Sequence, residues 1–368
     1  MAKVSIVRTI QGVKQGLFDA VELIGGLASY IGHADKILLK PNLNGTEGVT
    51  NKELVEALIQ LLFDFGVGKV FIAEATFGDA RVTNMCFHKT GFSDLASKYN
   101  IELVNLNCSQ IVEVKVARPF VLETLRIARE AYEADKIINL PIMKVHYATG
   151  ITLALKNMKG ILVGDEKKHF HEVGLDKAIV DLNNTIKHSL NIVDGILCME
   201  RMGPRGGDLV KLGLIMAGSE AAEVDYVGSQ IMGYAVSEVK HVEQYLETNR
   251  IDVDRIEVVG ERVEDVRYPF KKVNLKKILP KEFRIHNRNA CSACENAFIL
   301  SCQFLEKVPS QTVDVYMGEI IEDDISVEGM KIGFGSCCSA DIELDRIIKG
   351  CPPYPCTLRD YLHARGVA

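Results

Sequence analysis

Short runs of apolar and β-branched residues alternate with amphipathic segments over the first two-thirds of the chain. Residues 4–7 and 36–39 are predicted to be buried strands, because they are short and rich in valine, isoleucine and leucine. Residues 13–30 and 52–65 carry apolar side chains at the spacing of an amphipathic helix, and Gly66 follows the second helix where a glycine commonly ends one. The pattern therefore predicts repeated strand–helix units.

The same alternation continues further along the chain. Additional strands are predicted at 69–72, 102–104, 136–140, 191–193 and 212–217, and additional helices at 92–99, 120–134, 175–190 and 221–234. Such repeats imply an α/β fold, with a mainly parallel, Rossmann-like sheet and helices on both faces. We expect a first α/β domain at 1–149, a second α/β block with a charged connector at 150–281, and a cysteine-rich iron–sulfur module at 282–368.

Composition and charge argue against two classes of partner. The net charge is −6 and the pI about 5.9, whereas a general nucleic-acid binder carries a basic surface. No apolar run approaches the roughly 18 residues of a membrane span, and residues 1–7 are typical of a strand, not of a signal peptide. We expect a cytoplasmic protein that binds neither nucleic acid nor membrane. The oligomeric state is left open.

The cysteines are concentrated near the C-terminus, where seven of the ten occur. In a cytoplasmic chain, thiols at this density indicate a metal site before they indicate disulfides. Cys291 and Cys294 form a C-x2-C step, which can direct two thiolates to one metal centre. The remaining five are Cys302, Cys337, Cys338, Cys351 and Cys356.

An iron–sulfur cluster fits these spacings better than zinc. Structural zinc typically uses two C-x2-C pairs, and this segment contains one. Cys351 precedes a proline, a neighbour common around iron–sulfur clusters. We predict a [4Fe-4S] cluster, with zinc, disulfides or unbound thiols as alternatives. The expected ligands are Cys291, Cys294 and Cys302, with a fourth from Cys337, Cys338 or Cys351.

Polar residues follow several of the predicted strands, at the ends where parallel sheets bind their ligands. Lysine and histidine there can hold an anion, or act as acid and base near neutral pH. The candidates for a catalytic role are Lys40, Lys144, His146 and Asp194. The candidates for ligand binding are Asn42, Lys156, Asn157 and Arg205.

Each of these segments also has a structural interpretation. Residues 41–45 contain the proline, asparagine and glycine of an ordinary turn. Lys156 and Lys159 can form a solvated basic helix face. Glu74 and Asp79 suit a cation or proton transfer, but a carboxylate there can equally cap the next helix. The local charge is nevertheless mainly positive in an acidic protein, which favours a small anionic substrate, a carboxylate or a phosphate.

Five segments, taken together, resemble a known family. They are L-L-K-P-N-L-N-G (38–45), P-I-M-K-V-H (141–146), T-L-A-L-K-N-M-K-G (152–160), N-I-V-D-G-I (191–196) and M-G-P-R-G-G (202–207). As a set they resemble domain-of-unknown-function family 362, prokaryotic proteins often described as iron–sulfur or ferredoxin-like, over about residues 1–235. The resemblance implies the α/β architecture and an iron–sulfur segment, but no reaction. The ferredoxin run C-x2-C-x2-C-x3-C-P is missing, so a ferredoxin fold is not expected.

Three functional hypotheses follow from the cysteines and the basic strand ends. The first is an iron–sulfur oxidoreductase acting on a small anionic substrate, with a redox partner protein. The second uses the cluster as a Lewis acid in a hydro-lyase, which needs an open iron position and so only three cysteine ligands. The third is an electron-transfer or cluster-carrying protein without catalysis of its own.

Overall fold

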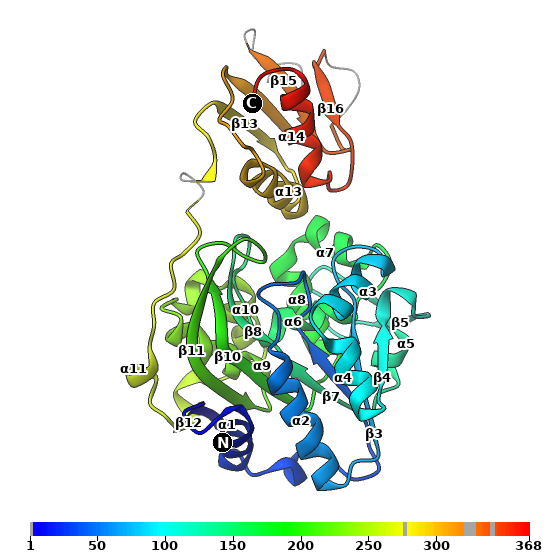
Figure 1. The fold of residues 1–368 in the computed structure, drawn as a ribbon, viewed down its shortest axis with the longest axis vertical. Coiled ribbons are helices and arrows are strands. Elements are labelled where there is room, and N and C mark those ends of the chain that lie inside the picture. The colour runs from blue at the N-terminus through cyan, green and yellow to red at the C-terminus, as the bar shows by residue number, and fades with distance from the viewer. Residues whose placement is uncertain (1–2, 275–277, 320–328, 339–342) are drawn as a thin grey trace. The chain divides into compact units, whose positions relative to one another are not determined.

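The computed structural model describes residues 3–274, 278–319, 329–338 and 343–368 (Figure 1). The chain folds into two compact units, an α/β unit of residues 1–167 and 176–273 and a C-terminal unit of residues 168–175 and 274–368. The blocks expected at 1–149 and 150–281 are therefore not separate domains. Strands β10 (Leu190–Glu200) and β11 (Asp208–Gly218) from the second block lie inside the sheet of the first, and their hydrogen bonds merge the two.

A mostly parallel sheet forms the centre of the α/β unit. Its strands run in the order β12–β1–β11–β10–β7–β2–β3–β4, and β8 pairs with β10 and β9. From β10 to β4 all neighbours are parallel, whereas β11 is antiparallel to β1 and β10. The remaining bounds are β1 (Lys3–Arg8), β2 (Lys36–Pro41), β3 (Lys69–Glu74), β4 (Glu102–Asn105), β7 (Lys136–Leu140), β8 (Ile142–His146), β9 (Gly150–Thr152) and β12 (Glu257–Gly260).

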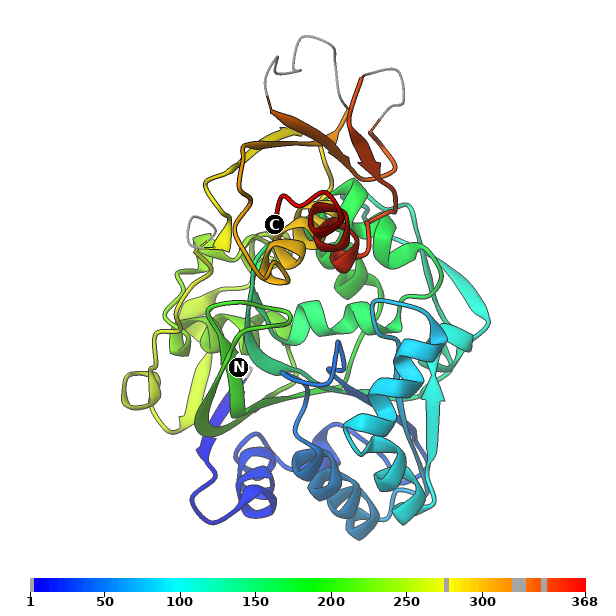
Figure 2. The same cartoon turned by 45° about the horizontal axis from the view of Figure 1, so that its top comes forward.

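Helices cover both faces of this sheet (Figures 1 and 2). One face carries α1 (Val13–Leu23), α2 (Lys52–Phe65) and α4 (Phe92–Tyr99), and the other α6 (Ala154–Asn157), α8 (Leu175–Thr185), α9 (Ala221–Ile231) and α10 (Lys240–Thr248). The ends of α2 follow from local chemistry. The Asn51 side chain accepts a hydrogen bond from Glu53 N at 2.8 Å, and Gly66 ends the helix with a φ of 95°.

The alternation of side chains along each strand separates an apolar face from a polar one. Leu39 and Ile138 point into the hydrophobic core beneath α1 and α2. Their neighbours Lys40 and Asn139, which are paired in register, point to the opposite face, because successive strand residues alternate. Asn191 is paired with Asn139 on the adjacent strand. Three neighbouring strands thus place polar side chains side by side on the α6 face.

The sequence pattern was misleading at several places. The helices predicted at 13–30 and 175–190 end earlier, at Leu23 and Thr185. The helix predicted at 120–134 is wrong, because residues Thr124–Ala128 form strand β6, followed by a single helical turn, α5 (Arg129–Tyr132). Strand β6 pairs antiparallel with β5 (Ile111–Lys115), and this pairing overrides the helical spacing. The strand predicted at 191–193 runs on to Glu200, because β11 pairs along its whole length.

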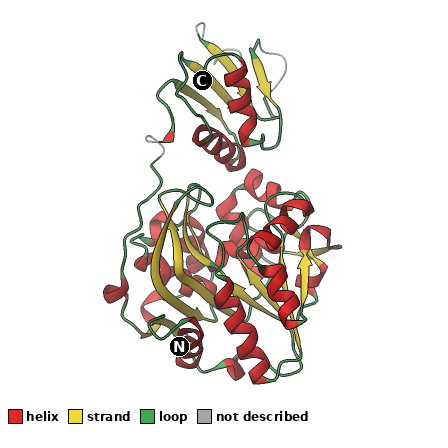
Figure 3. Cartoon of the chain, in the orientation of Figure 1, coloured by secondary structure: helices red, strands yellow, loops and turns green. Residues whose placement is uncertain are grey.

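The C-terminal unit is built on a second sheet, of four parallel strands (Figure 3). Its core joins Phe298, Val315, Ile332 and Leu358. The strands run in the order β13 (Phe283–Arg288), β14 (Val313–Gly318), β15 (Met330–Phe334) and β16 (Arg346–Ile348), with helices α13 (Ser292–Gln303) and α14 (Pro355–Ala364). Loops that carry cysteines follow β13, β15 and β16, so the thiols belong to the carboxyl ends of parallel strands.

The shorter elements connect these layers. They are η1 (Leu27–Ser29), α3 (Ala80–Lys89), η2 (Leu106–Cys108), η3 (Met158–Ile161), α7 (Glu166–Val173), η4 (Val236–Glu238), η5 (Val253–Arg255) and α11 (Val263–Val266). Among the helices that the structure describes, none has the length and apolar character needed to cross a membrane.

Candidate functional site

A buried ion pair joins the ends of two neighbouring parallel strands. Lys40 lies near the end of β2, and Glu74 is the last residue of β3. The Lys40 ammonium contacts the Glu74 carboxylate and donates to Pro41 O at 2.8 Å, while Ala75 N donates to the same carboxylate at 2.8 Å. Burial lowers the pKa of Lys40 and raises the pKa of Glu74, and the attraction between them opposes both shifts. The pair is held in a protein interior where a lone charge would be costly.

Gly160 closes over this ion pair. A side-chain carbon at position 160 would collide with both the Glu74 carboxylate and the Lys40 ammonium. The backbone of η3 can therefore approach the pair only because residue 160 lacks a side chain. The approach is fixed by a hydrogen bond from Ala75 N to Gly160 O at 3.1 Å.

Lys144, on β8, is bound by neutral acceptors. Its ammonium donates to the Asn42 side-chain oxygen and to Gly48 O, both at 2.8 Å. Burial, reinforced by the positive charge of Arg205, lowers the pKa of Lys144 to about 7. Lys40 adds to the lowering, and Glu74 opposes it. The two lysines therefore converge on one region, as their positions after parallel strands predicted.

A chain of side-chain amides links the two lysines through the interior. Asn42 donates to the Asn157 oxygen at 2.8 Å, and Asn157 donates to the Asn139 oxygen at 2.8 Å and to Lys40 O at 3.2 Å. Asn139 donates in turn to Asn191 at 2.9 Å. The sequence pattern pointed to Asn42 and Asn157 but not to Asn139 and Asn191. Asn139 and Asn191 could have been recognised from the sequence, because each is an asparagine inside or at the edge of an otherwise apolar strand.

Three more lysines lie on the segments that cover this face. Burial lowers the pKa of Lys159 to about 7, with Lys167 adding to the effect, and burial lowers the pKa of Lys167 to about 7 against the pull of Glu74. Lys167 donates to Thr76 O at 3.4 Å. The pKa of Lys156 is also far below its usual value, first because of burial and then because of Lys159 and Lys144. Sequence analysis did not assign Lys167 to the site.

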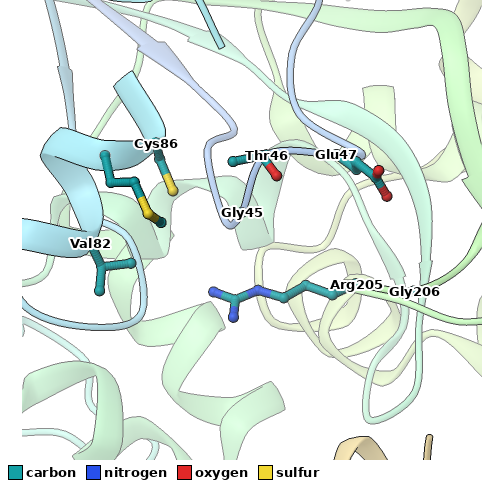
Figure 4. Close-up of a pocket in the computed structure, with 8 residues that line it drawn as sticks. Gly45, Thr46, Glu47, Val82, Cys86, Arg205 and Gly206 are labelled. Atoms are coloured by element: carbon teal, nitrogen blue, oxygen red, sulfur yellow. The ribbon is translucent and has the colours of Figure 1, made fainter. Parts of the chain in front are cut away.

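Arg205 lines a small cavity next to this group (Figure 4). Its guanidinium donates to Asn44 O at 3.1 Å and to the Asn44 side-chain oxygen at 3.0 Å. Figure 4 shows the guanidinium between Gly45 and the helix that carries Val82 and Cys86. The cavity has a volume of about 240 Å³ and is lined by Gly45, Thr46, Glu47, Val82, Met85, Cys86, Arg205 and Gly206.

Asp194 and His146 have clear local roles. Asp194 is buried within β10, where its oxygens accept from Asn51 N at 2.6 Å and Ile196 N at 2.9 Å. Burial raises the pKa of Asp194 to about 6, and these N–H groups oppose the rise. His146 ends β8, accepts from Ala148 N at 3.1 Å and packs against Tyr147. Asp194 therefore fixes the start of α2, and His146 fixes the turn after β8.

Two acidic side chains, one at the end of β3 and one in the loop after it, have different structural roles. Asp79 accepts from Arg81 N at 2.9 Å and Val82 N at 3.1 Å, so it caps α3, as the structural interpretation of the sequence predicted. Glu74 instead forms the buried pair with Lys40.

Four cysteines of the C-terminal unit gather at the carboxyl ends of its strands. Cys291 precedes α13, and the Cys294 side chain is hydrogen-bonded to it, which lowers the pKa of Cys291 to about 6. A side-chain carbon at Gly335, whose φ is 121°, would lie 3.2 Å from the Cys294 sulfur and 3.3 Å from the Cys337 sulfur. The charges of Cys337 and Cys351 also act on Cys294 and raise its pKa, after the larger effects of Cys291 and burial.

Two other candidate ligands are part of the packing instead. Cys302 lies in the hydrophobic core of the C-terminal unit, where burial raises its pKa to about 12. Cys338 is buried with Tyr316 and its sulfur donates to Tyr316 O at 3.3 Å. Of the predicted ligands, Cys294 and Cys337 are thus the ones that meet at Gly335, and Cys302 and Cys338 take part in the packing. In the described parts of the chain, no three His, Cys, Asp or Glu side chains are grouped to hold a single metal ion.

Comparison with known proteins places the α/β unit in context. Residues 37–230 match the model of a family described as "Domain of unknown function (DUF362)". A thylakoid-associated protein of Synechocystis is 31% identical in an alignment 224 residues long, which covers 58% of this chain and 67% of that protein. The family match covers most of the α/β unit, including the basic site, together with residues 168–175, and the cysteine-rich segment lies beyond the matched residues.

Two solved structures are similar to this chain at TM-scores below 0.5. A Thermotoga maritima protein from a structural genomics consortium has a TM-score of 0.42 at 14% identity, covering 85% of this chain and 71% of that chain. The lactate racemase apoprotein from Thermoanaerobacterium thermosaccharolyticum has a TM-score of 0.44 at 11% identity, covering 86% of this chain and 68% of that chain.

Proposed function

This chain belongs to the DUF362 family, and we propose that it is an iron–sulfur oxidoreductase whose α/β unit binds a small anionic substrate. The proposal joins two features that lie in different units. The C-terminal unit gathers thiols at the ends of parallel strands, and the α/β unit gathers buried lysines around a buried carboxylate, Glu74.

The observation that carries the cluster assignment is the placement of thiols around Gly335. Cys294 and Cys337, which are far apart in the sequence, both lie next to the space that a side chain at Gly335 would fill. With Cys291 and Cys351 they would supply the four thiolates that a [4Fe-4S] cluster uses. A cubane cluster spreads its ligands over its corners, so they lie farther apart than the ligands of one ion. These residues therefore fit a cluster.

Four protein thiolates favour electron transfer over Lewis-acid chemistry. A hydro-lyase needs an iron position open to substrate, which four cysteine ligands would occupy. When bound, the cluster would supply one-electron redox chemistry. The α/β unit would contribute the other requirement of such an enzyme, a site that binds and orients the substrate.

A non-catalytic electron carrier is the second candidate. It is favoured by the exposure of Cys337 and Cys351, because exposed ligands allow a redox partner protein to approach the cluster. The two candidates differ in one respect that can be measured. An enzyme's cluster is reduced or reoxidised by a small anion, whereas a carrier's cluster responds only to a partner protein.

The cluster assignment can be tested by anaerobic purification with iron, acid-labile sulfide and zinc analysis. We expect iron and sulfide in similar amounts and an EPR signal in one oxidation state. Cys337→Ser should lose most of the iron, because it removes one of the four proposed ligands. The matched control, Cys302→Ala, should keep the iron, because Cys302 lies in the apolar core. Stoichiometric zinc without sulfide, or equal iron loss in both variants, would contradict the assignment.

A further inference from the structure

We propose that the ligand of the α/β unit carries at least two negative charges, as a phosphate ester or a dicarboxylate does. This inference rests on the anion-binding half of the proposed function. It follows from counting the charges in the region of Lys40, Lys144, Lys167 and Arg205 and from the neutral character of their hydrogen-bond partners.

One lysine of the region is already neutralised. Lys40 forms its ion pair with Glu74 beneath Gly160, so this pair adds no net charge. The charge of Glu74 also acts on both Lys144 and Lys167. A ligand is therefore not needed to balance Lys40, but Glu74 cannot balance the other lysines as well.

The remaining cations are bound by neutral groups. Lys144 donates to an amide oxygen and a backbone carbonyl, Lys167 to a backbone carbonyl, and Arg205 to the backbone and side-chain oxygens of Asn44. Lys144 and Lys167 are also buried, with exposed fractions of 1% and 8%. Removing a charged ammonium from water is unfavourable unless an opposite charge accompanies it. These hydrogen bonds all go to neutral groups, and the carboxylate in the wall of the Arg205 cavity, Glu47, is exposed to solvent. Two buried lysines and one arginine bound in this way fit a ligand with two or more negative charges.

The available space limits the ligand's size. The cavity beside Arg205 has a volume of about 240 Å³, below the range of about 300–1,000 Å³ for sites of drug-sized ligands. It lies within electrostatic reach of the ion pair and the lysines, because the Arg205 charge acts on Lys144 and the Glu74 charge acts on Cys86 in the cavity wall. A small dianion fits both the volume of the cavity and the positive charge around it.

Such a ligand should bind with uptake of protons. Lys144, Lys159 and Lys167 each have a pKa of about 7, so at pH 8 they are mostly neutral. A bound anion favours their charged form and raises the pKa values. Each lysine that meets the ligand then takes up a proton at pH 8, but at pH 6 it already carries one. Affinity should therefore fall as the pH rises through 7.

The experiment is isothermal titration calorimetry of the full chain with succinate, inorganic phosphate and acetate. Comparing two buffers of different ionisation enthalpy gives the number of protons taken up. We expect each dianion to bind at least about tenfold more tightly than acetate, the value of one added charge-assisted hydrogen bond. For succinate, which is mostly a dianion at both pH values, we expect about one to three protons taken up at pH 8 and about none at pH 6.

Variants identify the lysines involved. Lys167→Met should lower the proton uptake by about one and weaken dianion binding, because it removes one titrating cation. Lys177→Met, a substitution of an exposed lysine on α8, should change neither quantity. A difference between succinate and phosphate would decide between carboxylate and phosphate as the natural group.

The outcomes distinguish the inference of a dianionic ligand from the proposal that the α/β unit binds an anion. Acetate binding as tightly as both dianions, without proton uptake, would overturn the dianion inference and leave an anion site in place. Failure of all three anions to bind at pH 6 and pH 8 would overturn the anion site itself.

Discussion

Gly160 is the residue on which the buried Lys40–Glu74 pair depends most directly. Gly160→Ala would drive a methyl group into both charged groups. We expect the free energy of unfolding to fall by about 2–4 kcal/mol, from overpacking and from disturbance of a buried pair. Urea unfolding of the purified protein measures this change.

Gly68 provides the matched control for that substitution. A side-chain carbon there would have no atom within 4 Å, so Gly68→Ala should leave the free energy of unfolding nearly unchanged. Equal losses in the two variants would mean that the ion pair does not need the close approach of η3.

At the scale of elements, helix α6 is held by a buried carboxylate. Asp225, on α9, accepts from Ala154 N at 2.6 Å and Leu155 N at 3.0 Å, at the start of the helix that carries Lys156 and Asn157. Burial raises the pKa of Asp225 to about 7, and the two N–H groups oppose the rise. The carboxylate therefore positions α6, and the free energy needed to keep it ionised in the interior depends on pH.

The sign of this dependence follows from the raised pKa. Between the unfolded pKa of about 4 and the folded pKa of about 7, the folded protein binds more protons at Asp225, so stability falls as the pH rises. Asp225→Asn removes this slope. The wild-type free energy of unfolding, relative to the variant, should decrease by about 1.4 kcal/mol for each step of one in pH between these two values. Denaturation at pH 4.5 and pH 7.5 measures it, and an increase with pH would contradict the assignment.

At the scale of the whole molecule, the two units should respond separately to loss of the proposed cluster. A metal centre that binds only the folded state stabilises the unit that contains its ligands. Cys337→Ser should therefore lower the protection of β13–β16 in hydrogen exchange and leave β2, β3 and β7 unchanged. Equal loss of protection in both units would show that the C-terminal unit does not hold the cluster by itself.

Local pattern was sufficient for most elements and for the type of fold. The helix at residues 92–99 and the end of α2 at Gly66 were predicted correctly, because spacing and capping are encoded within one or two turns. The mainly parallel α/β sheet and the DUF362 family were also predicted correctly. The helix predicted at 120–134 failed, because antiparallel pairing of β6 with the preceding strand β5 outweighed the local spacing.

The sequence by itself determined the α/β class, the family, and the presence of basic residues after strands and of cysteines near the C-terminus. Only the tertiary structure decided which of them meet. Strand register brought Asn139 and Asn191 to the lysines, and the insertion of β10 and β11 merged the two expected blocks into one unit. Burial distinguished Cys302 from Cys337, and backbone N–H groups engaged Asp194. Periodicity is a local property, whereas a shared site depends on contacts between residues a hundred positions apart.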